Sequence, residues 1–435
     1  KTAYEIMPSL VGSEMCIRDS IKCTHKKQLI NNYMANLNIH MTHLEDTVFL
    51  LGIKDTRQSI DFLRGLRDML KGHSDKAVNT SVKWDGAPAL FIGKHPETGK
   101  FLVAKKSLFN KKPLFYTSVD EIKKSPDLNS ELKKKFIVAF NEFKNSNIPN
   151  IIQGDFLFEG SDLKKGVRID GDTFVTFHPN TIVYSVPEAS ELGKTLKKKN
   201  FGIVFHTTYT GRMLSGMQSR AGVTLPKHSD KAWVIDADYK DVSGSANLTN
   251  GDLKKFDGHL SAAGTAFTKI GTAAFDIFKH PEIAIMATTY TNSFVRAGRQ
   301  PAASEAAAGF VEFIKAKFKS EIDKRSTDKG KATQRQKMMQ ILMPLKSVET
   351  KLPHMFTLYY ELMMAKNEII KKMSNTGFIR TFLKTTDGWK VTGQEGFVAI
   401  DRTGTKSVKL VDRLEFSYAN FSKDVIKGWE TDLRK

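Results

Sequence analysis

The chain has 435 residues, of which 40% are hydrophobic, enough for two or three domains with their own cores. No apolar run could span a membrane, and two cysteines, Cys16 and Cys23, exclude a four-cysteine zinc site and a disulfide framework. A net charge of +20 predicts a polyanionic partner. The 29 phenylalanines among many lysines favour nucleic acid over an anionic membrane or a merely soluble basic protein. Few cysteines fit the reducing cytoplasm.

The first twenty residues of the chain are not expected to belong to a folded domain. Residues 1–20 resemble translated sequencing-adapter sequence and lack the apolar core of a signal peptide, so we exclude them from fold reasoning. The native start is then expected at Met34, Met41 or nearby. Residues 42–72 predict a packing helix, with one apolar face made of Phe62, Leu63, Leu66, Met69 and Leu70.

A lysine-bearing turn follows the helix. A short apolar run leads into Lys83-Trp84-Asp85-Gly86, and β-prone residues 89–92 come after it. The pattern predicts a strand, a tight turn and a second strand. At such a turn the lysine can point into a pocket, and Gly86 lets a ligand approach the backbone. A surface hairpin with a solvated lysine would give the same pattern, so the motif alone is weak.

The middle of the chain alternates predicted strands and helices. Basic and aromatic residues meet around Lys105 and Lys106, and residues 119–148 predict helix. Asp155 lies in a strand directly after Gly154, and residues 162–172 predict a polar turn. Two short strands in 173–186 carry Phe177 and Tyr184. A lone histidine, His206, is interpreted as a core or surface residue.

Helical periodicity dominates from about residue 250 to 380, in lysine-rich and methionine-rich sequence. Strands return afterwards. Glu395 opens one at residues 395–400, and Lys409 lies in another at residues 407–411. A short helical tail is expected to end the chain.

The segments around Lys83, Asp155, Glu395 and Lys409 resemble motifs I, III, IV and V of the covalent nucleotidyltransferases. These are ATP-dependent DNA ligases, RNA ligases and mRNA capping enzymes. Each motif is common alone, but four in order on predicted strands are not. The resemblance implies an α+β fold, namely a ligase-type adenylation domain of antiparallel sheets with helices, interrupted by an α-helical insert. Only residues 410–435 follow Lys409, so no C-terminal OB-fold is expected.

This resemblance divides the chain into five parts. They are a non-native segment (1–20), an N-terminal helical segment (21–75), the first part of the adenylation domain (76–249), a helical insert that would clamp nucleic acid (250–380) and the second part of the adenylation domain (381–435).

The implied function is that of an ATP-dependent polynucleotide ligase of viral type. Lys83 would attack the α-phosphate of ATP, AMP would pass to a 5′-phosphate, and a 3′-hydroxyl would displace it. The missing zinc cysteines count against the NAD-dependent ligases. The expected partner is a nicked or broken duplex of DNA, RNA or both, bound by a monomer in the cytoplasm, that of the host if the protein is viral.

The resemblance also implies roles for individual residues. Lys83 and Lys409 are the expected catalytic residues, and Glu395 and Asp155 would hold Mg²⁺, for which Mn²⁺ could substitute. Phe177 or Tyr184 would stack on adenine, with core packing as the alternative role. Because a free lysine is protonated at neutral pH, nearby cations or burial should lower the pKa of Lys83. The expected nucleotide-binding residues are Val82, Trp84, Asp85, Gly86, Lys105, Lys106, Asp155, Phe177, Tyr184 and Lys406.

Three positions depart from the family pattern. Pro88 replaces a common arginine, Asp155 is one methylene shorter than the usual glutamate, and Val411 replaces a second motif V lysine. Two alternatives therefore stay open. One is a GTP-dependent capping-type guanylyltransferase, and the other is a non-catalytic nucleic-acid-binding protein with a ligase-like fold.

Overall fold

A computed structural model describes residues 42–70, 79–237, 248–374, 379–400 and 407–429. The segment predicted to be adapter-derived, both candidate start residues and Lys406 lie outside these ranges. The chain divides into two compact units, residues 1–42 and 43–435. The description below concerns the second, to which His43 of the two-residue strand β1 (Thr42–His43) belongs.

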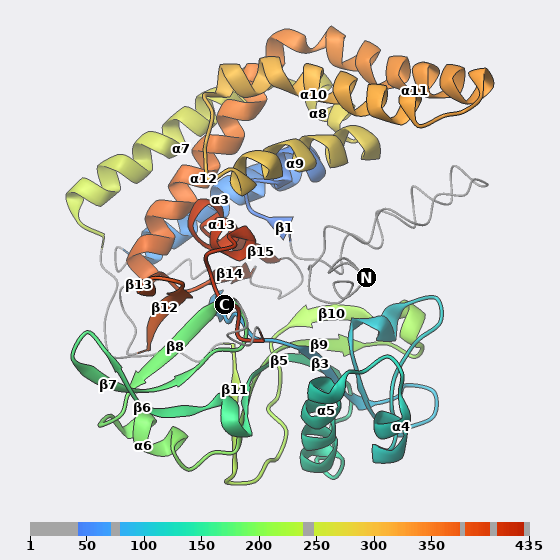
Figure 1. The fold of residues 1–435 in the computed structure, drawn as a ribbon. Coiled ribbons are helices and arrows are strands. Elements are labelled where there is room, and N and C mark those ends of the chain that lie inside the picture. The colour runs from blue at the N-terminus through green and yellow to red at the C-terminus, as the bar shows by residue number, and fades with distance from the viewer. Residues whose placement is uncertain (1–41, 71–78, 238–247, 375–378, 401–406, 430–435) are drawn as a thin grey trace. The chain divides into compact units, whose positions relative to one another are not determined.

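Helices occupy the start of this unit and a long stretch after residue 250. Capping side chains mark where several of them begin. At the start of α7, the Thr249 side chain accepts a hydrogen bond from the Asp252 backbone N–H, and the Asp252 side chain accepts one from the Thr249 backbone N–H. Figure 1 shows α10 and α11 as a helical hairpin. The helices are α2 (Thr47–Leu50), α3 (Gly52–Leu70), α4 (Val119–Lys124), α5 (Ser130–Phe143), α6 (Glu191–Leu196), α7 (Asn250–Ile270), α8 (Thr272–Phe278), α9 (Pro281–Arg296), α10 (Ala303–Asp323), α11 (Asp328–Ser347), α12 (Leu352–Ser374) and α13 (Tyr418–Phe421).

The strands of the described residues form three sheets. The first has the order β10-β9-β5-β3-β4, with β11 parallel to β9. Its strands are β3 (Ala89–Lys94), β4 (Phe101–Ala104), β5 (Ile151–Glu159), β9 (Phe201–Thr210), β10 (Gln218–Ala221) and β11 (Ala232–Asp236). The second has the order β13-β12-β8-β7-β6, from β6 (Lys164–Ile169), β7 (Asp172–Phe177), β8 (Ile182–Pro187), β12 (Arg380–Thr385) and β13 (Gly388–Val391).

The third sheet carries the lysine motif. Its order is β1-β15-β14-β2, built from β1 (Thr42–His43), β2 (Asn79–Lys83), β14 (Gly396–Ile400) and β15 (Ser407–Leu410). The β2–β14 and β14–β15 pairs are antiparallel. Segments separated by more than 300 positions in the sequence therefore become neighbouring strands.

This third sheet shares one apolar core with helices α2, α3 and α7–α12. Leu63 and Leu66 of α3 pack in the same cluster as Phe356 of α12, and Phe397 and Leu410 belong to it too. Helices α7–α12 therefore bury their apolar faces together with α2, α3 and two strands of the lysine-bearing sheet. This packing positions β14 and β15.

A second apolar core lies between the first two sheets, where Trp84, Phe158, Phe177, Tyr184 and Trp233 pack together. Helix α5 covers the other face of the first sheet with Phe136, Phe140 and Phe143.

The predicted α+β class with antiparallel sheets is confirmed, with 50% helix and 22% strand. The ligase-type fold and the domain division stay predictions. Residues 164–169, predicted to be a polar turn, form β6. None of the helices in the described ranges combines the length and apolar character that a membrane crossing requires.

Candidate active site

The centre of the site is a contact between Lys83 and Glu395. Lys83 is the last residue of β2, and Glu395 directly precedes β14, whose first residue, Gly396, lies opposite Lys83. Lys83 Nζ donates a hydrogen bond to Glu395 Oε1. Gly396 has φ +149°, and a side chain there would collide with the Leu410 carbonyl oxygen. A glycine is therefore required where Glu395 turns toward the lysine.

Lys409 lies one strand further along the same sheet. It is opposite Val398 in the β14–β15 pair, and its carbonyl oxygen accepts a hydrogen bond from the Leu44 backbone N–H at 3.1 Å. Its electrostatic interactions with Lys83 and Glu395 are strong enough to shift its pKa. The sheet thus brings together Lys83, Glu395 and Lys409, as the sequence predicts.

Burial and mutual charge set the protonation of these groups. Burial raises the pKa of Glu395 to about 7, although Lys83 opposes the shift. Burial, together with the positive charge of Lys83, lowers the pKa of Lys409 to about 8. For Lys83, burial also acts to lower the pKa, but Glu395, Asp85 and Asp155 outweigh it and leave the pKa raised. In the described residues the pKa of Lys83 is therefore raised, contrary to the expectation that cations or burial lower it, and Lys409 is the amine whose pKa is lowered.

Asp85 is engaged by the protein itself. Its carboxylate accepts hydrogen bonds from Asn180 Nδ2 and the Thr181 backbone N–H, both at 2.6 Å, and from the Ile182 backbone N–H at 2.8 Å. Burial raises its pKa, although these donors favour the ionised form. Asp85 thus joins the lysine turn to the start of β8, and its predicted contact with nucleotide stays a prediction.

Gly86 is required by the protein backbone. A Cβ at this position would lie 2.5 Å from Asp155 Cβ and 2.9 Å from the Phe156 carbonyl oxygen. The Ala87 backbone N–H donates to that same oxygen at 2.8 Å. The absence of a side chain thus lets the turn lie directly against β5, which brings Asp155 to the site.

Asp155 has a histidine neighbour that the sequence did not single out as functional. His206 Nε2 lies 3.4 Å from Asp155 Oδ2, and His206 Nδ1 is 2.7 Å from Thr207 Oγ1. Both Asp155 and His206 are partly exposed. Strand pairing between β5 and β9 brings them together, and no local sequence pattern marks such a pair.

The aromatic residues near the turn pack on one another. Phe177 and Tyr184 stack with ring centroids 5.2 Å apart and are almost fully buried, and Trp84 lies 5.0 Å from Tyr184. The Tyr184 hydroxyl oxygen accepts a hydrogen bond from the Asp85 backbone N–H at 2.6 Å. This arrangement fits the core-packing alternative, because protein atoms occupy the ring faces that adenine would need. Val82 is also partly buried between two cores.

The two predicted basic residues after β4 differ in position. Lys105 Nζ donates to the Asp127 carbonyl oxygen at 3.0 Å on the exposed surface. Lys106 begins the 3-10 turn Lys106–Phe109 and contributes to the lowered pKa of Lys409, so its charge acts on the site.

His43, on β1, was also missed by sequence reasoning. Within the described residues, its buried Nδ1 atom has no hydrogen-bond partner. Burial lowers its pKa well below the usual value, and the charges of Arg413, Lys409 and Lys83 add to the effect. These three cationic side chains thus act on the buried ring of His43, although each of them also pairs with a carboxylate.

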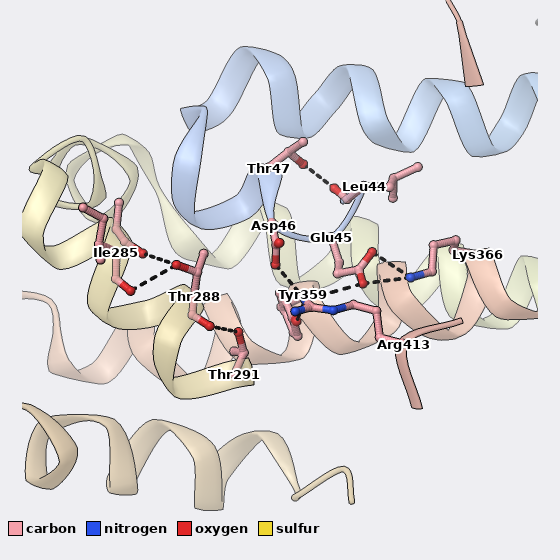
Figure 2. A network of polar contacts seen from close by, with 11 residues as sticks. Leu44, Glu45, Asp46, Thr47, Ile285, Thr288, Thr291, Tyr359, Lys366 and Arg413 are labelled. Carbon is pink, nitrogen blue, oxygen red and sulfur yellow. Dashed lines mark hydrogen bonds and ion pairs between the residues drawn. The ribbon is translucent and has the colours of Figure 1, made fainter. Parts of the chain in front are cut away.

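Beneath the site lies a buried polar network, seen in Figure 2. Lys366 of α12 bonds both carboxylate oxygens of Glu45, and Arg413 bonds Asp46 Oδ1 at 3.0 Å and the Tyr359 hydroxyl at 2.9 Å. The available sequence signal was Lys366 itself, which stands at helical spacing from Tyr359, Met363 and Ile370 on the apolar face of the helix. The network joins the segment before α2, helix α12 and the segment after β15.

The donor set is compatible with Mg²⁺. Glu395 Oε2 is buried and, within the described residues, has no protein partner, while Asp155 is partly exposed nearby. Mg²⁺ commonly takes one or two carboxylates and completes its shell with water and substrate phosphates. No group of three or more His, Cys, Asp or Glu residues suited to a metal occurs in the described ranges. A metal here would therefore need further ligands from water or from a bound substrate.

Comparison with known proteins adds a family but no activity. Neither the curated proteins nor the solved structures contain a match to this chain. A family model described as "Family of unknown function (DUF6267)" matches residues 38–425, which include Lys83, Glu395, Lys409 and the buried network. The chain belongs to the DUF6267 family.

Proposed function

We propose that the protein is an ATP-dependent polynucleotide ligase that works through a lysyl-AMP intermediate on Lys83. The observation that carries the proposal is the meeting of Lys83, Glu395 and Lys409 on adjacent strands. Phosphoryl transfer to an amine needs a nucleophile, a proton acceptor and positive charge near the phosphate. The partly buried Lys83, the Glu395 carboxylate and the Lys409 amine would supply these three.

In the first step Lys83 Nζ attacks the α-phosphorus of ATP. The N–P bond forms, the bond to the bridging oxygen breaks, and pyrophosphate leaves. Lys83 must lose a proton to act as a nucleophile, because its pKa is raised. Glu395 already accepts a hydrogen bond from Lys83 Nζ, and with a pKa of about 7 it can take that proton near neutral pH.

Lys409 and Lys106 would stabilise the charge that develops on the phosphate oxygens. Mg²⁺ held by Asp155 would neutralise phosphate charge in the same place. Glu395, the other predicted ligand, could bind the ion only after it has released the lysine proton, because a metal-bound carboxylate is a poor base. An oxygen of a 5′-phosphate then attacks the adenylate phosphorus and Lys83 leaves. Finally a 3′-hydroxyl attacks the 5′-phosphorus, which forms the phosphodiester and releases AMP.

The test is the intact mass of the protein after incubation with ATP and Mg²⁺. We expect a gain of one AMP moiety in the wild type, none in Lys83→Ala, and the wild-type gain in Lys100→Ala, a lysine on the exposed hairpin between β3 and β4. Protein that forms the adduct is then given nicked DNA, nicked RNA and hybrid substrates.

A gain of GMP from GTP, without one from ATP, would replace the ligase with the capping-type guanylyltransferase. No adduct with either nucleotide, from protein shown to be free of prior adenylation, would contradict the covalent mechanism. An adduct that survives in Lys83→Ala would place the nucleophile elsewhere.

A further inference from the structure

Helix α11 packs on α10 in the helical hairpin of Figure 1 and is covered along one side. Its residues Ile341 and Leu345 belong to the helical core, whereas Met339 and Met343 are 51% and 65% exposed. Residues two positions apart on a helix do not share a face. Among the described residues, the side of α11 that faces away from the core therefore has no covering element.

Positive charge is concentrated where the two helices of the hairpin meet. Residues 324–337, which lead from the end of α10 into α11, hold six basic residues and one acidic residue. Their net charge of +5 is a quarter of the +20 of the whole chain, although they are fourteen of its 435 residues. We call this segment the basic tip. Its charged residues are Lys324, Arg325, Asp328, Lys329, Lys331, Arg335 and Lys337.

The charges on α11 are not neutralised in the way that those on α10 are. On α10, Lys315 and Lys324 each pair with a glutamate three residues earlier, at 2.7 and 2.8 Å. In the part of the chain that the structure describes, no ion-pair or side-chain hydrogen-bond partner exists for Lys329, Lys331, Arg335 and Lys337 of α11. Like charges four residues apart, as at 331 and 335, destabilise a helix. An external anion would relieve this repulsion.

The arrangement of these four charges fits an extended anion with two charged edges. By helical spacing, Lys331 and Arg335 share one side of α11, and Lys329 and Lys337 share another. The stretch from 329 to 337 covers about 12 Å of helix axis, a length over which duplex DNA carries about seven phosphate charges. Two rows of cations suit the two phosphate strands of a duplex better than one strand.

The apolar side chains of the hairpin argue against base stacking and against lipid. Its three phenylalanines, Phe310, Phe313 and Phe318, pack in or against the helical core, so they are not available to stack on unpaired bases. A helix that lies on a membrane surface inserts an apolar face. On α11 that face, with Ile341 and Leu345, is already packed in the core.

We propose that the basic tip of the α10–α11 hairpin binds the phosphate backbone of duplex nucleic acid, independently of base sequence. Unpaired basic side chains clustered along one helix are the electrostatic footprint of such a partner. The expected clamp of residues 250–380 is thereby narrowed to residues 324–337. Duplex binding does not depend on the proposed function; only the role of the duplex as the substrate joined at Lys83 rests on it.

The test is fluorescence anisotropy of a short labelled DNA duplex of random sequence, measured without ATP at several salt concentrations. We expect the triple variant Lys331→Gln/Arg335→Gln/Lys337→Gln to bind at least roughly ten-fold more weakly. Its plot of log affinity against log salt should be shallower by about two to three, because each phosphate contact contributes about 0.9 to that slope. Glutamine is a good helix former, so α11 should persist, which circular dichroism checks.

Two further variants separate local charge from total charge. Lys331→Arg/Arg335→Lys/Lys337→Arg keeps the charge of the tip and should bind like the wild type. Lys164→Gln/Lys165→Gln/Arg168→Gln removes three basic side chains from exposed positions on β6, and its affinity should stay within about three-fold of the wild type.

The proposal is refuted if the folded tip variant binds the duplex like the wild type, or if the β6 variant loses as much affinity. It also falls if the wild type does not bind the duplex. Binding of the wild type to vesicles of phosphatidylcholine and phosphatidylserine, but not to the duplex, would make an anionic lipid surface the partner instead.

The AMP adduct on the wild type is measured separately. Duplex binding that depends on the basic tip, without an adduct, would overturn the ligase proposal alone. An adduct together with unchanged duplex binding in the tip variant would overturn the basic tip alone.

Discussion

Lys366 and Glu45 form an ion pair with no exposed surface on either side chain, with Lys366 Nζ 2.8 and 2.9 Å from the two carboxylate oxygens. Lys366 belongs to α12, and Glu45 directly follows Leu44, whose backbone N–H bonds the Lys409 carbonyl oxygen. The pair therefore ties the helical core to the strand that carries Lys409.

We expect Lys366→Met to lower the free energy of unfolding by about 3–5 kcal/mol, because it leaves the Glu45 carboxylate buried without its principal partner. Urea denaturation measures the loss. Lys194→Met breaks an exposed pair with Glu191 and should change stability by less than about 1 kcal/mol. Glu45→Leu combined with Lys366→Met should recover much of the loss. Equal effects of the two single variants would contradict this reading of the network.

A second prediction concerns Gly396. Gly396→Ala should destabilise the protein by more than about 2 kcal/mol, because φ is +149° and the new Cβ would meet the Leu410 carbonyl oxygen. The control is Gly216→Ala, where no atom lies within 4 Å of the added Cβ. Thermal melts compare the two. A Gly396→Ala variant as stable as Gly216→Ala would show that β14 can shift freely.

Sequence reasoning found the elements whose patterns are local. The periodic apolar residues of 250–380 predicted helix, and Lys83, Glu395 and Lys409 were singled out from motifs that the structure brings to one sheet. It missed β6, because Lys164–Ile169 has mostly polar, exposed residues that look like a loop. Only pairing with β7 makes this segment a strand.

Contacts between distant segments explain the other omissions. The Glu45–Lys366 pair joins residues 321 positions apart, and the Asp155–His206 contact depends on the register of β5 and β9. The roles of Asp85 and Gly86 also became clear only when the neighbouring strands were placed. One sequence carries no local trace of such pairings.

A third prediction follows from Lys409. Its pKa is about 8 in the fold and about 10.5 in an unfolded chain, so the folded state disfavours its protonated form. The penalty is absent above pH 10.5 and fully present below pH 8. Lys409→Met should therefore stabilise the protein at pH 7 by about 1–2 kcal/mol, less than the pKa difference implies, because the side chain is only partly buried.

Chemical denaturation at pH 7 and at pH 10 measures this difference. The gain from Lys409→Met should shrink at pH 10, while Lys390→Met, at an exposed position on β13, should give no pH-dependent difference. If Lys409→Met instead destabilises the protein at pH 7, then Lys409 stabilises the fold, and its burial would no longer argue for a role in function.

The last prediction concerns the proton that Lys83 must lose. If Glu395 accepts it, the rate of AMP-adduct formation should rise as the pH increases through about 7, where Glu395 ionises. Glu395→Gln cannot accept a proton and should lower the rate by roughly 10²–10⁴-fold. Rapid-quench time courses from pH 5.5 to 8.5 test both, with Glu97→Gln, an exposed position, as the control. If Glu395→Gln forms the adduct at a rate within about three-fold of the wild type and with the same pH profile, another group accepts the proton.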